Sequence, residues 1–157
     1  MNLDARILSI LRSLGNSPIS AADLANQLHV SRSTITAHIA ELRRVGFDIP
    51  AAPHGGYRLV GTPKTLNSDD IMSRLGTVNV IGRDIRVFNE TSSTNDIIDK
   101  LAHDGVAEGV VVFAEAQKAG RGRLGRSWFS PKGKGLWFSV LLRPRLRPQE
   151  TPQITVL

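Results

Sequence analysis

Cysteine is absent from the 157 residues of this chain, which excludes disulfide bonds, thiol catalysis and thiolate metal ligands. The sequence also has no apolar run of roughly 18 residues, the length that a membrane-spanning helix needs. Its first residues alternate charged and aliphatic side chains, with Asp4 near the start, and neither a signal-peptide core nor a cleavage site follows them. We therefore expect a cytoplasmic protein without a membrane partner.

Acidic residues are few and unevenly placed, since 14 acidic residues stand against 20 Lys and Arg. Residues 1–62 carry a net charge of +2, and residues 63–117 carry −4. Residues 118–147 contain nine basic residues and no acidic residue. Like charges at this density repel one another, so this segment is predicted to contact an anion. A solvated basic surface is the alternative.

Apolar periodicity in the first 62 residues predicts three helices followed by a small hairpin. Two alternating segments, 47–49 and 56–60, would form the hairpin around a turn that contains Pro and Gly. This plan is typical of a winged helix-turn-helix domain. Three residues are predicted to begin the helices: Leu3, Ser20 and Ser31. Two glycines are predicted to end the first and the third: Gly15 and Gly46. The third helix is predicted to bury Ile35, Ile39, Leu42 and Val45.

The third predicted helix is a candidate DNA-reading element. In a helix-turn-helix the second helix of the unit lies in the major groove and presents its N-terminal residues to the bases. Arginine pairs with guanine, while hydroxyl groups reach bases or phosphates. His38 and Arg44 suit phosphate contact, and residues 54–58 form a candidate wing tip. The predicted DNA-binding residues are Ser31, Arg32, Ser33, Thr36, Arg43 and Arg58. A winged helix that binds protein is the alternative, because the charge of this part is low.

The rest of the chain, residues 63–157, mixes helical and strand patterns after a cluster of turn residues at 61–64. Residues 120–126 contain three Gly and three Arg and are predicted to be neither helix nor strand. Strands are predicted over residues 83–89, 109–114 and 135–142. Helices are predicted to begin near Asn67 or Ser68, to span 94–102 with Gly105 after them, and to begin at 151–157.

Two short segments have the composition of ligand-binding elements. Residues 91–95 (TSSTN) gather hydroxyls, an amide and free backbone N–H groups at a helix start, which suits a neutral polar ligand. A simple helix cap is the alternative. In residues 120–126 glycine permits close approach of backbone to phosphate, and arginine neutralises it. This segment matches neither a Walker loop nor a dinucleotide-binding loop. We expect a loop that an anionic ligand orders, with a rigid turn packed by Leu124 and Trp128 as the alternative.

The run QKAGRGRLGRSWFSPKGKGLWFSVLLRP, from Gln117 to Pro144, resembles the signature of biotin–protein ligases, and SSTND at 92–96 resembles their biotin motif. With the preceding helices, the chain resembles the bacterial ligases that also repress biotin-synthesis genes. The resemblance implies an α+β fold. A winged helix-turn-helix would occupy residues 1–62, and an incomplete α/β biotin-ligase catalytic domain with a mixed sheet would occupy residues 63–157.

The resemblance also assigns roles by position. The biotin-binding residues would be Ser93, Thr94, Asn95, Gln117, Arg121, Gly122 and Arg123. The nucleotide-binding residues would be Gly120, Arg121, Arg123, Arg126 and Trp128. Arg121 and Arg123 would be the catalytic residues, and Mg²⁺ would arrive with ATP, with no metal ligands in the protein.

The reaction implied by the resemblance joins biotin and ATP to biotinyl-5′-AMP and then transfers biotin to a lysine of a biotin carboxyl carrier protein. Operator DNA and a ligand-dependent homodimer are the other expected partners. The later lysine motif of the family has no counterpart in these 157 residues, so we expect a partial sequence with little turnover of its own and an exposed apolar surface. A non-catalytic regulator that senses biotin or its adenylate, and a lipoate ligase, are the alternatives.

Overall fold

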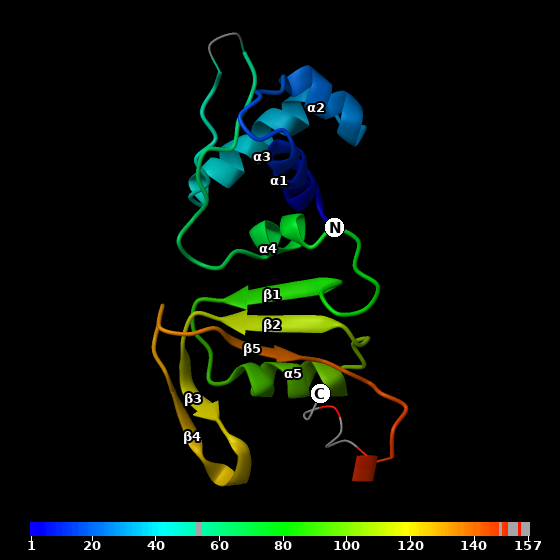
Figure 1. The fold of residues 1–157 in the computed structure, drawn as a ribbon, viewed down its shortest axis with the longest axis vertical. Helices are drawn as coiled ribbons and strands as arrows, with labels where there is room; N and C mark the ends of the chain where they lie inside the picture. The colour runs from blue at the N-terminus through cyan, green and yellow to red at the C-terminus, as the bar shows by residue number, and fades with distance from the viewer. Residues whose placement is uncertain (53–54, 148, 151–153, 155–157) are drawn as a thin grey trace.

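The computed structural model describes residues 1–52, 55–147, 149–150 and 154. A bundle of helices lies at one end of the molecule and a small sheet at the other, with a short helix between them (Figure 1). Most of the helix start predicted at 151–157, and His54 of the predicted wing tip, lie outside the described residues. Across the described ranges, no helix combines the length and the apolar character that crossing a membrane requires.

The bundle consists of α1 (Leu3–Ser13), α2 (Ala21–Leu28) and α3 (Arg32–Arg44). Each helix begins after a polar residue whose side chain accepts a hydrogen bond from the backbone N–H three positions on, which satisfies a donor that the first turn leaves free. These capping residues are Asn2, Ser20 and Ser31. The three predicted helices are confirmed. Val45 was wrongly predicted to be buried: it is 38% exposed, because the helix ends before it and Gly46 turns the chain at φ +100°.

The wing that follows α3 is less regular than predicted. Isolated bridges join Asp48 to Gly61 and Ala51 to Tyr57, and the described part of residues 47–61 contains no regular strand. The two strands predicted there were wrong. Proline within the segment lacks the N–H donor that a ladder needs. Phe47 and Ile49 are buried against the helices, and backbone hydrogen bonds from Asp48 to Gly61 and from Val60 to Asp48 join the two sides of the wing.

The sheet contains β1 (Asp84–Phe88), β2 (Val110–Ala114) and β5 (Trp137–Val140) in the order β1-β2-β5. β1 and β2 are parallel, whereas β2 and β5 are antiparallel, so the predicted mixed sheet is confirmed. The helix α5 (Thr94–His103) connects β1 to β2 and covers one face of the sheet. The buried contacts between helix and sheet come from Ile98, Leu101, Val110, Val112 and Leu141.

A separate hairpin carries the Gly/Arg segment. It consists of β3 (Gln117–Arg121) and β4 (Ser127–Ser130), with a single 3-10 turn, η1 (Arg123–Gly125), between them. The prediction that residues 120–126 form neither helix nor strand was wrong for Gly120 and Arg121, which belong to β3. It is confirmed for Gly122 and Arg126, and the residues between them form only the single 3-10 turn. Gly120 pairs with β4 so closely that a Cβ there would lie 2.9 Å from the carbonyl oxygen of Trp128. Glycine here permits close strand pairing, and the chain reverses at Leu124 and Gly125, which both have positive φ.

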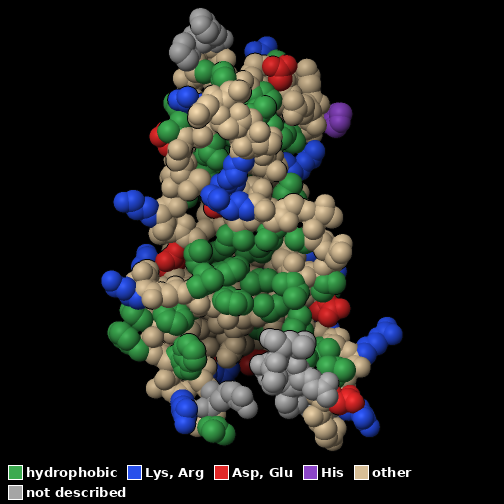
Figure 2. All heavy atoms as spheres, viewed as in Figure 1, with side chains coloured by type: hydrophobic (Ala, Val, Ile, Leu, Met, Phe, Trp, Pro, Cys, Tyr) green, Lys and Arg blue, Asp and Glu red, His purple; other side chains and the backbone are tan. Residues whose placement is uncertain are grey.

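The face of the sheet opposite α5 is an apolar hollow of about 250 Å³. Figure 2 shows apolar side chains gathered across the middle of the molecule, over the sheet. Ile85 and Val111 are 7% and 6% exposed at its base, whereas Leu136 and Phe138 are 58% and 51% exposed at its edge. The expected exposed apolar surface is confirmed within the described residues.

The bundle and the sheet meet through α4 (Ser68–Arg74), which Asn67 caps, so the predicted helix start near Asn67 or Ser68 is confirmed. The guanidinium of Arg12 on α1 donates hydrogen bonds to Ser73 and Asp70 on α4. Asn2 Nδ2 donates to Asp69 Oδ1 at 2.7 Å. Burial raises the pKa of the Asp69 carboxyl, and the hydrogen bond from Asn2 opposes that shift. Polar contacts thus bring the two parts of the chain together.

Candidate ligand pocket and nucleic-acid surface

A pocket of about 270 Å³ opens where the start of α5, the hairpin β3–β4 and strand β5 meet. Side chains from both predicted ligand segments line it, although the two segments are far apart in the sequence. The lining residues are Ser93, Thr94, Asn95, Gln117, Arg121, Trp128, Leu136, Trp137, Phe138 and Ser139. The last four come from or just before β5 and were not among the residues assigned to biotin or the nucleotide. Side chains alternate between the two faces of a strand, so Ser139 lies on the same face as Trp137. This alternation is the sequence signal that could have identified Ser139.

Hydrogen bonds lock the polar side of the pocket. Gln117 Oε1 accepts from the backbone N–H of Thr94 at 2.8 Å and from its hydroxyl at 3.1 Å. Ser139 Oγ lies 2.8 Å from Thr94 Oγ1 and donates to Asn95 Oδ1 at 2.6 Å. Gln117 Nε2 donates to Ser130 Oγ at 3.0 Å. Each of these groups has a fixed direction before a ligand enters, which suits recognition of a neutral ligand through hydrogen bonds.

Helix α5 begins at this polar cluster. Ser93 is its N-cap and is 1% exposed, and its hydroxyl accepts from the N–H of Asn95 at 3.3 Å. The helix cap that was the alternative to a ligand role is therefore present. The cap and the pocket use the same residues, because the Asn95 and Thr94 side chains extend from the first turn into the pocket lining.

Arg121 lies at the rim of this pocket, where two carboxylates of α5 hold it. Its Nη2 atom lies 2.6 Å from Asp96 Oδ1 and 3.3 Å from Asp99 Oδ2. The other oxygen of Asp96 accepts from Ser92 Oγ at 2.8 Å. The expected repulsion among the arginines is thus offset at this position by acidic partners outside the basic segment.

The two tryptophans of the chain stand beside each other in the pocket. The rings of Trp128 and Trp137 meet edge to face, with centroids 6.5 Å apart and planes at 87°. Trp128 is 58% exposed, so part of its ring is free to contact a ligand. A Cβ on Gly122 would lie 2.5 Å from Trp128 Nε1. Glycine at 122 therefore lets the backbone lie against the indole edge.

The remaining predicted ligand residues lie on the turn of the hairpin. Gly122 N donates to the carbonyl oxygen of Arg126 at 2.7 Å, which closes the turn. The Arg126 side chain is exposed, and the Arg123 side chain is outside what the structure describes. Leu124 is 92% exposed, so it does not pack the turn as the rigid-turn alternative requires. Within the described ranges, no group of three or more His, Asp and Glu side chains is placed to hold a metal ion.

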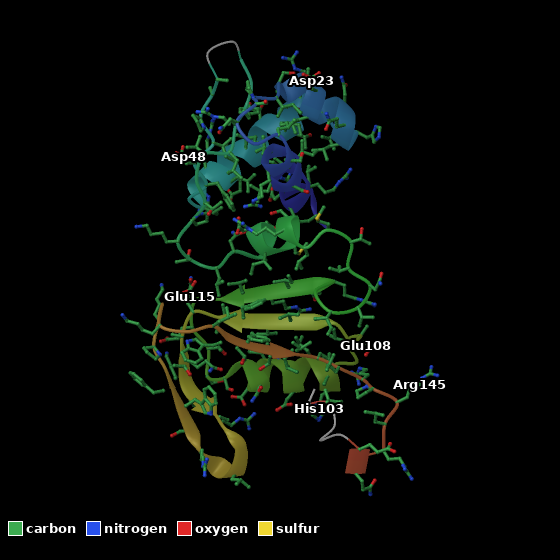
Figure 3. The ribbon with its side chains drawn as sticks, in the orientation of Figure 1. Asp23, Asp48, His103, Glu108, Glu115 and Arg145 are labelled. Carbon is green, nitrogen blue, oxygen red and sulfur yellow. The ribbon has the colours of Figure 1, made fainter. Side chains whose placement is uncertain are left out.

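Glu115 lies at the carboxyl end of β2, where the chain turns toward the hairpin, and Glu108 lies at the opposite end of the sheet (Figure 3). Glu115 is 8% exposed, and its side chain accepts a hydrogen bond from the N–H of Leu66 at 2.5 Å. It therefore ties the segment before α4 to the sheet. Its contact is with backbone, and it is not among the residues that line the ligand pocket.

On α3, the predicted DNA-binding residues fall into two groups. Arg32, Ser33 and Thr36 are exposed on its N-terminal half, next to the Ser31 cap. Arg43 lies at the other end of the helix, where its Nε donates to the Ile49 carbonyl at 2.7 Å and its guanidinium lies 5.6 Å from the centre of the Tyr57 ring. The structure therefore brings the first group together and commits Arg43 to the wing.

Two further basic side chains near α3 have protein partners, and a third is half-buried. His38 Nδ1 lies 2.7 Å from Asp4 Oδ1, and Arg44 pairs with Glu41 at 2.6 Å, which raises the pKa of Arg44. Arg58 is half-buried beside an apolar hollow that includes Pro18 and Pro50. Arg32 is the exposed arginine at the N-terminal end of this predicted surface.

Two families match the two parts of the chain. Residues 5–58 match the model of an HTH domain, and residues 87–157 match the biotin/lipoate A/B protein ligase family. The chain thus combines a part that matches an HTH domain with a part that matches the biotin/lipoate A/B protein ligase family. This is the class of protein that the predicted motifs indicated.

Two relatives are named as both a ligase and a repressor. The bifunctional ligase/repressor BirA of Bacillus subtilis is 37% identical over 96% of this chain and 46% of its own length. The bifunctional ligase/repressor BirA of Escherichia coli is 35% identical over 87% of this chain and 41% of its own length. The chain therefore spans about half the length of the curated relatives that it matches. Among solved structures, biotin protein ligase from Aquifex aeolicus in complex with biotin and ATP is 40% identical over 40% of this chain and 25% of that chain, with a TM-score of 0.34.

Proposed function

We propose that this chain forms the DNA-binding part and the biotin-activating part of a biotin–protein ligase that also represses transcription. The observation that carries the proposal is the pocket in which the Ser-Thr-Asn segment and the Gly/Arg hairpin meet. In the proposed reaction, the biotin carboxylate attacks the α-phosphate of ATP, which gives biotinyl-5′-AMP and releases pyrophosphate. A lysine of a carrier protein then takes the biotinyl group as an amide and releases AMP.

The locked polar cluster supports a role in binding the ureido ring of biotin. That ring is neutral and both donates and accepts hydrogen bonds, as the amides and hydroxyls of this cluster do. The proposed ureido-binding residues are Ser93, Thr94, Asn95 and Gln117, with Ser139 as an addition from β5. Their mutual hydrogen bonds orient them in advance, so little ordering is left for the moment of binding.

The hairpin supports the proposed chemistry of the two anions. A carboxylate and a phosphate repel each other, so positive side chains and backbone donors are needed to bring them together. We assign biotin carboxylate binding to Arg121, Gly122 and Arg123, and nucleotide binding to Gly120, Arg121, Arg123, Arg126 and Trp128. Mg²⁺ would accompany ATP. Closure of the hairpin over the mixed anhydride would protect it from water.

The bundle supports the proposed repressor role through the exposed start of α3. We assign operator contact to Ser31, Arg32, Ser33 and Thr36, with Arg58 near the backbone of the DNA and Arg43 holding the wing. A homodimer would place two such helices on two half-sites.

We place the boundary between the two domains at residues 62 and 63. Since the proposed protein uses ATP and binds DNA, the proposed location is the cytoplasm.

Biotin-dependent exchange of labelled pyrophosphate into ATP, measured with the complete gene product, tests the enzymatic part. Exchange with biotin and none with lipoate or octanoate is the expected result. Exchange with lipoate or octanoate alone would replace the proposal by a lipoate-type ligase. Binding of biotin without any exchange would favour the non-catalytic regulator.

A further inference from the structure

One cation and two anions form a small ion-pair cluster at the mouth of the ligand pocket, here named the Arg121 cluster (Arg121, Asp96 and Asp99). The two carboxylates stand three positions apart on α5, on the same side of the helix, and both face strand β3. Ser92 binds the second oxygen of Asp96, which orients the first oxygen toward the guanidinium. The cluster therefore has a defined geometry without a ligand.

The charge of the Arg121 cluster does not match that of an anion-binding site. Two carboxylates and one guanidinium give a net charge of −1 at neutral pH, so a ligand carboxylate or phosphate meets repulsion there. A guanidinium has donors left for a further acceptor, but Nη2 of Arg121 is shared by both carboxylates. An anionic ligand must either draw Arg121 away from α5 or bind against this local negative charge.

We propose that Asp96 and Asp99 are positioning residues for Arg121, which they hold at the pocket mouth in the empty protein and release to the anionic group of the ligand. The inference rests on the proposed function for the identity of that ligand. Its consequence is selective: the two carboxylates lower the affinity for anionic ligands and leave the affinity for neutral analogues unchanged.

The ion pairs of the Arg121 cluster are weak enough for Arg121 to exchange the carboxylates for a ligand. The side chains of Arg121, Asp96 and Asp99 are 54%, 42% and 66% exposed. Ion pairs at this exposure contribute little to stability, because water and salt screen them. The carboxylates therefore keep Arg121 near the reacting groups without holding it too firmly for a ligand to displace them.

The first experiment uses the ligand-free chain. Hydrogen exchange of the Arg121 guanidinium, followed by nuclear magnetic resonance and assigned with Arg121→Lys, should be about two- to fivefold slower in the wild type than in the Asp96→Asn/Asp99→Asn double variant. Salt at 1 M should remove this difference. Glu90→Gln is the matched control, because it removes another exposed ion pair, that of Glu90 with Lys118, which lies on β3 as Arg121 does. It should leave the hydrogen exchange of the Arg121 guanidinium as in the wild type. Equal exchange in the wild type and the double variant would overturn the proposal.

The second experiment compares biotin, which carries a carboxylate, with biotinamide, which is neutral. Asp99→Asn should bind biotin roughly fourfold more tightly, the Coulomb effect of removing one charge at about 5 Å in water, and should bind biotinamide as the wild type does. Glu90→Gln should change neither affinity. An equal change for both ligands, or weaker binding of biotin, contradicts the proposal. If the wild type binds neither ligand, the proposed function fails for this chain, and the ligand-free exchange experiment alone decides the role of the carboxylates.

Discussion

Single side chains in the ligand pocket serve two segments at once. Gln117 accepts two hydrogen bonds from Thr94 with one end of its amide and donates one to Ser130 with the other. It therefore joins the first turn of α5 to both strands of the hairpin. A residue with this many partners in a half-buried place affects both the shape of the pocket and the stability of the elements around it.

Replacing Gln117 by Ala tests this connection. The change leaves the N–H of Thr94 without its acceptor and removes one partner of the Thr94 hydroxyl, so the free energy of unfolding should fall by about 1–3 kcal/mol. Biotin affinity of the same chain should fall by about tenfold or more, as the orientation of Thr94 and Ser130 is lost. Urea unfolding and calorimetric titration measure the two effects. Gln117→Glu keeps the acceptor and should retain more stability than Gln117→Ala, and the reverse order would contradict the assigned hydrogen bonds.

Arg32 and Arg43 differ in role although both lie on α3. Arg43→Ala should lower the free energy of unfolding by about 1 kcal/mol, because it removes the bond to Ile49 and the contact with Tyr57. Arg32→Ala should leave stability unchanged and weaken operator binding of the complete gene product by about 1–3 kcal/mol if it reads a base. Thermal unfolding and DNA titration separate the two. Unchanged operator affinity would remove Arg32 from the proposed contacts, and equal loss on unrelated DNA would make it a phosphate contact.

Among the elements, the hairpin β3–β4 departs most from the behaviour expected of a Gly/Arg loop. Its glycines occupy different environments. Gly120 faces the backbone of β4 closely, Gly122 lies against Trp128, and Gly125 has open space around it at φ +73°. Glycine is thus needed for close packing at two positions and for backbone conformation at the third.

Gly120→Ala should destabilise the hairpin by about 1–3 kcal/mol, since the added Cβ would lie 2.8 Å from Ser130 Oγ and 2.9 Å from the Trp128 carbonyl oxygen. The fluorescence of Trp128 and Trp137, the two tryptophans of the chain, reports the change. Gly125→Asn is the matched control, because asparagine tolerates positive φ and no atom lies within 4 Å of the added Cβ. A larger effect at position 125 than at position 120 would show that the turn, and not the strand pairing, fixes the hairpin.

The whole molecule is joined at α4. Arg12 and Asp70 are 20% and 19% exposed in their pair, and Asp70 also pairs with Arg74 at 3.1 Å. These contacts connect the helix that begins the proposed DNA-binding part to the helix next to β1. The orientation of the proposed DNA-reading helix relative to the ligand pocket thus depends on a few polar side chains.

Arg12→Met should loosen this connection. It keeps most of the apolar stem but removes the bonds to Asp70 and Ser73, so the free energy of unfolding should fall by about 1–3 kcal/mol. Small-angle X-ray scattering should show a broader distribution of distances between the two parts. Arg6→Met on the exposed side of α1 is the matched control and should change neither result. An unchanged scattering profile for Arg12→Met would mean that the apolar contacts of α1 and α4 suffice.

The order of helices and strands was predictable because each one has its own local signal. Ser31 and Gly46 bound α3, and the apolar run of β2 needs no partner to be recognised. The Ser-Thr-Asn segment and the Gly/Arg segment were likewise visible, and both line the pocket. The strand pairing of Gly120 and Arg121 was not visible in the sequence, since a glycine-rich sequence has low strand propensity. Contact with β4 overrides that propensity.

By itself, the sequence determined the helix caps, the two-part organisation and the types of side chain available for binding, because these depend on residues close together along the chain. Only the tertiary structure decided which of those side chains meet. It placed Ser139 in the polar cluster, committed Arg43 to the wing and set Asp96 and Asp99 against Arg121. Such pairings join residues 22 to 45 positions apart in the ligand pocket, and local composition contains no information on the register that brings them within hydrogen-bonding distance.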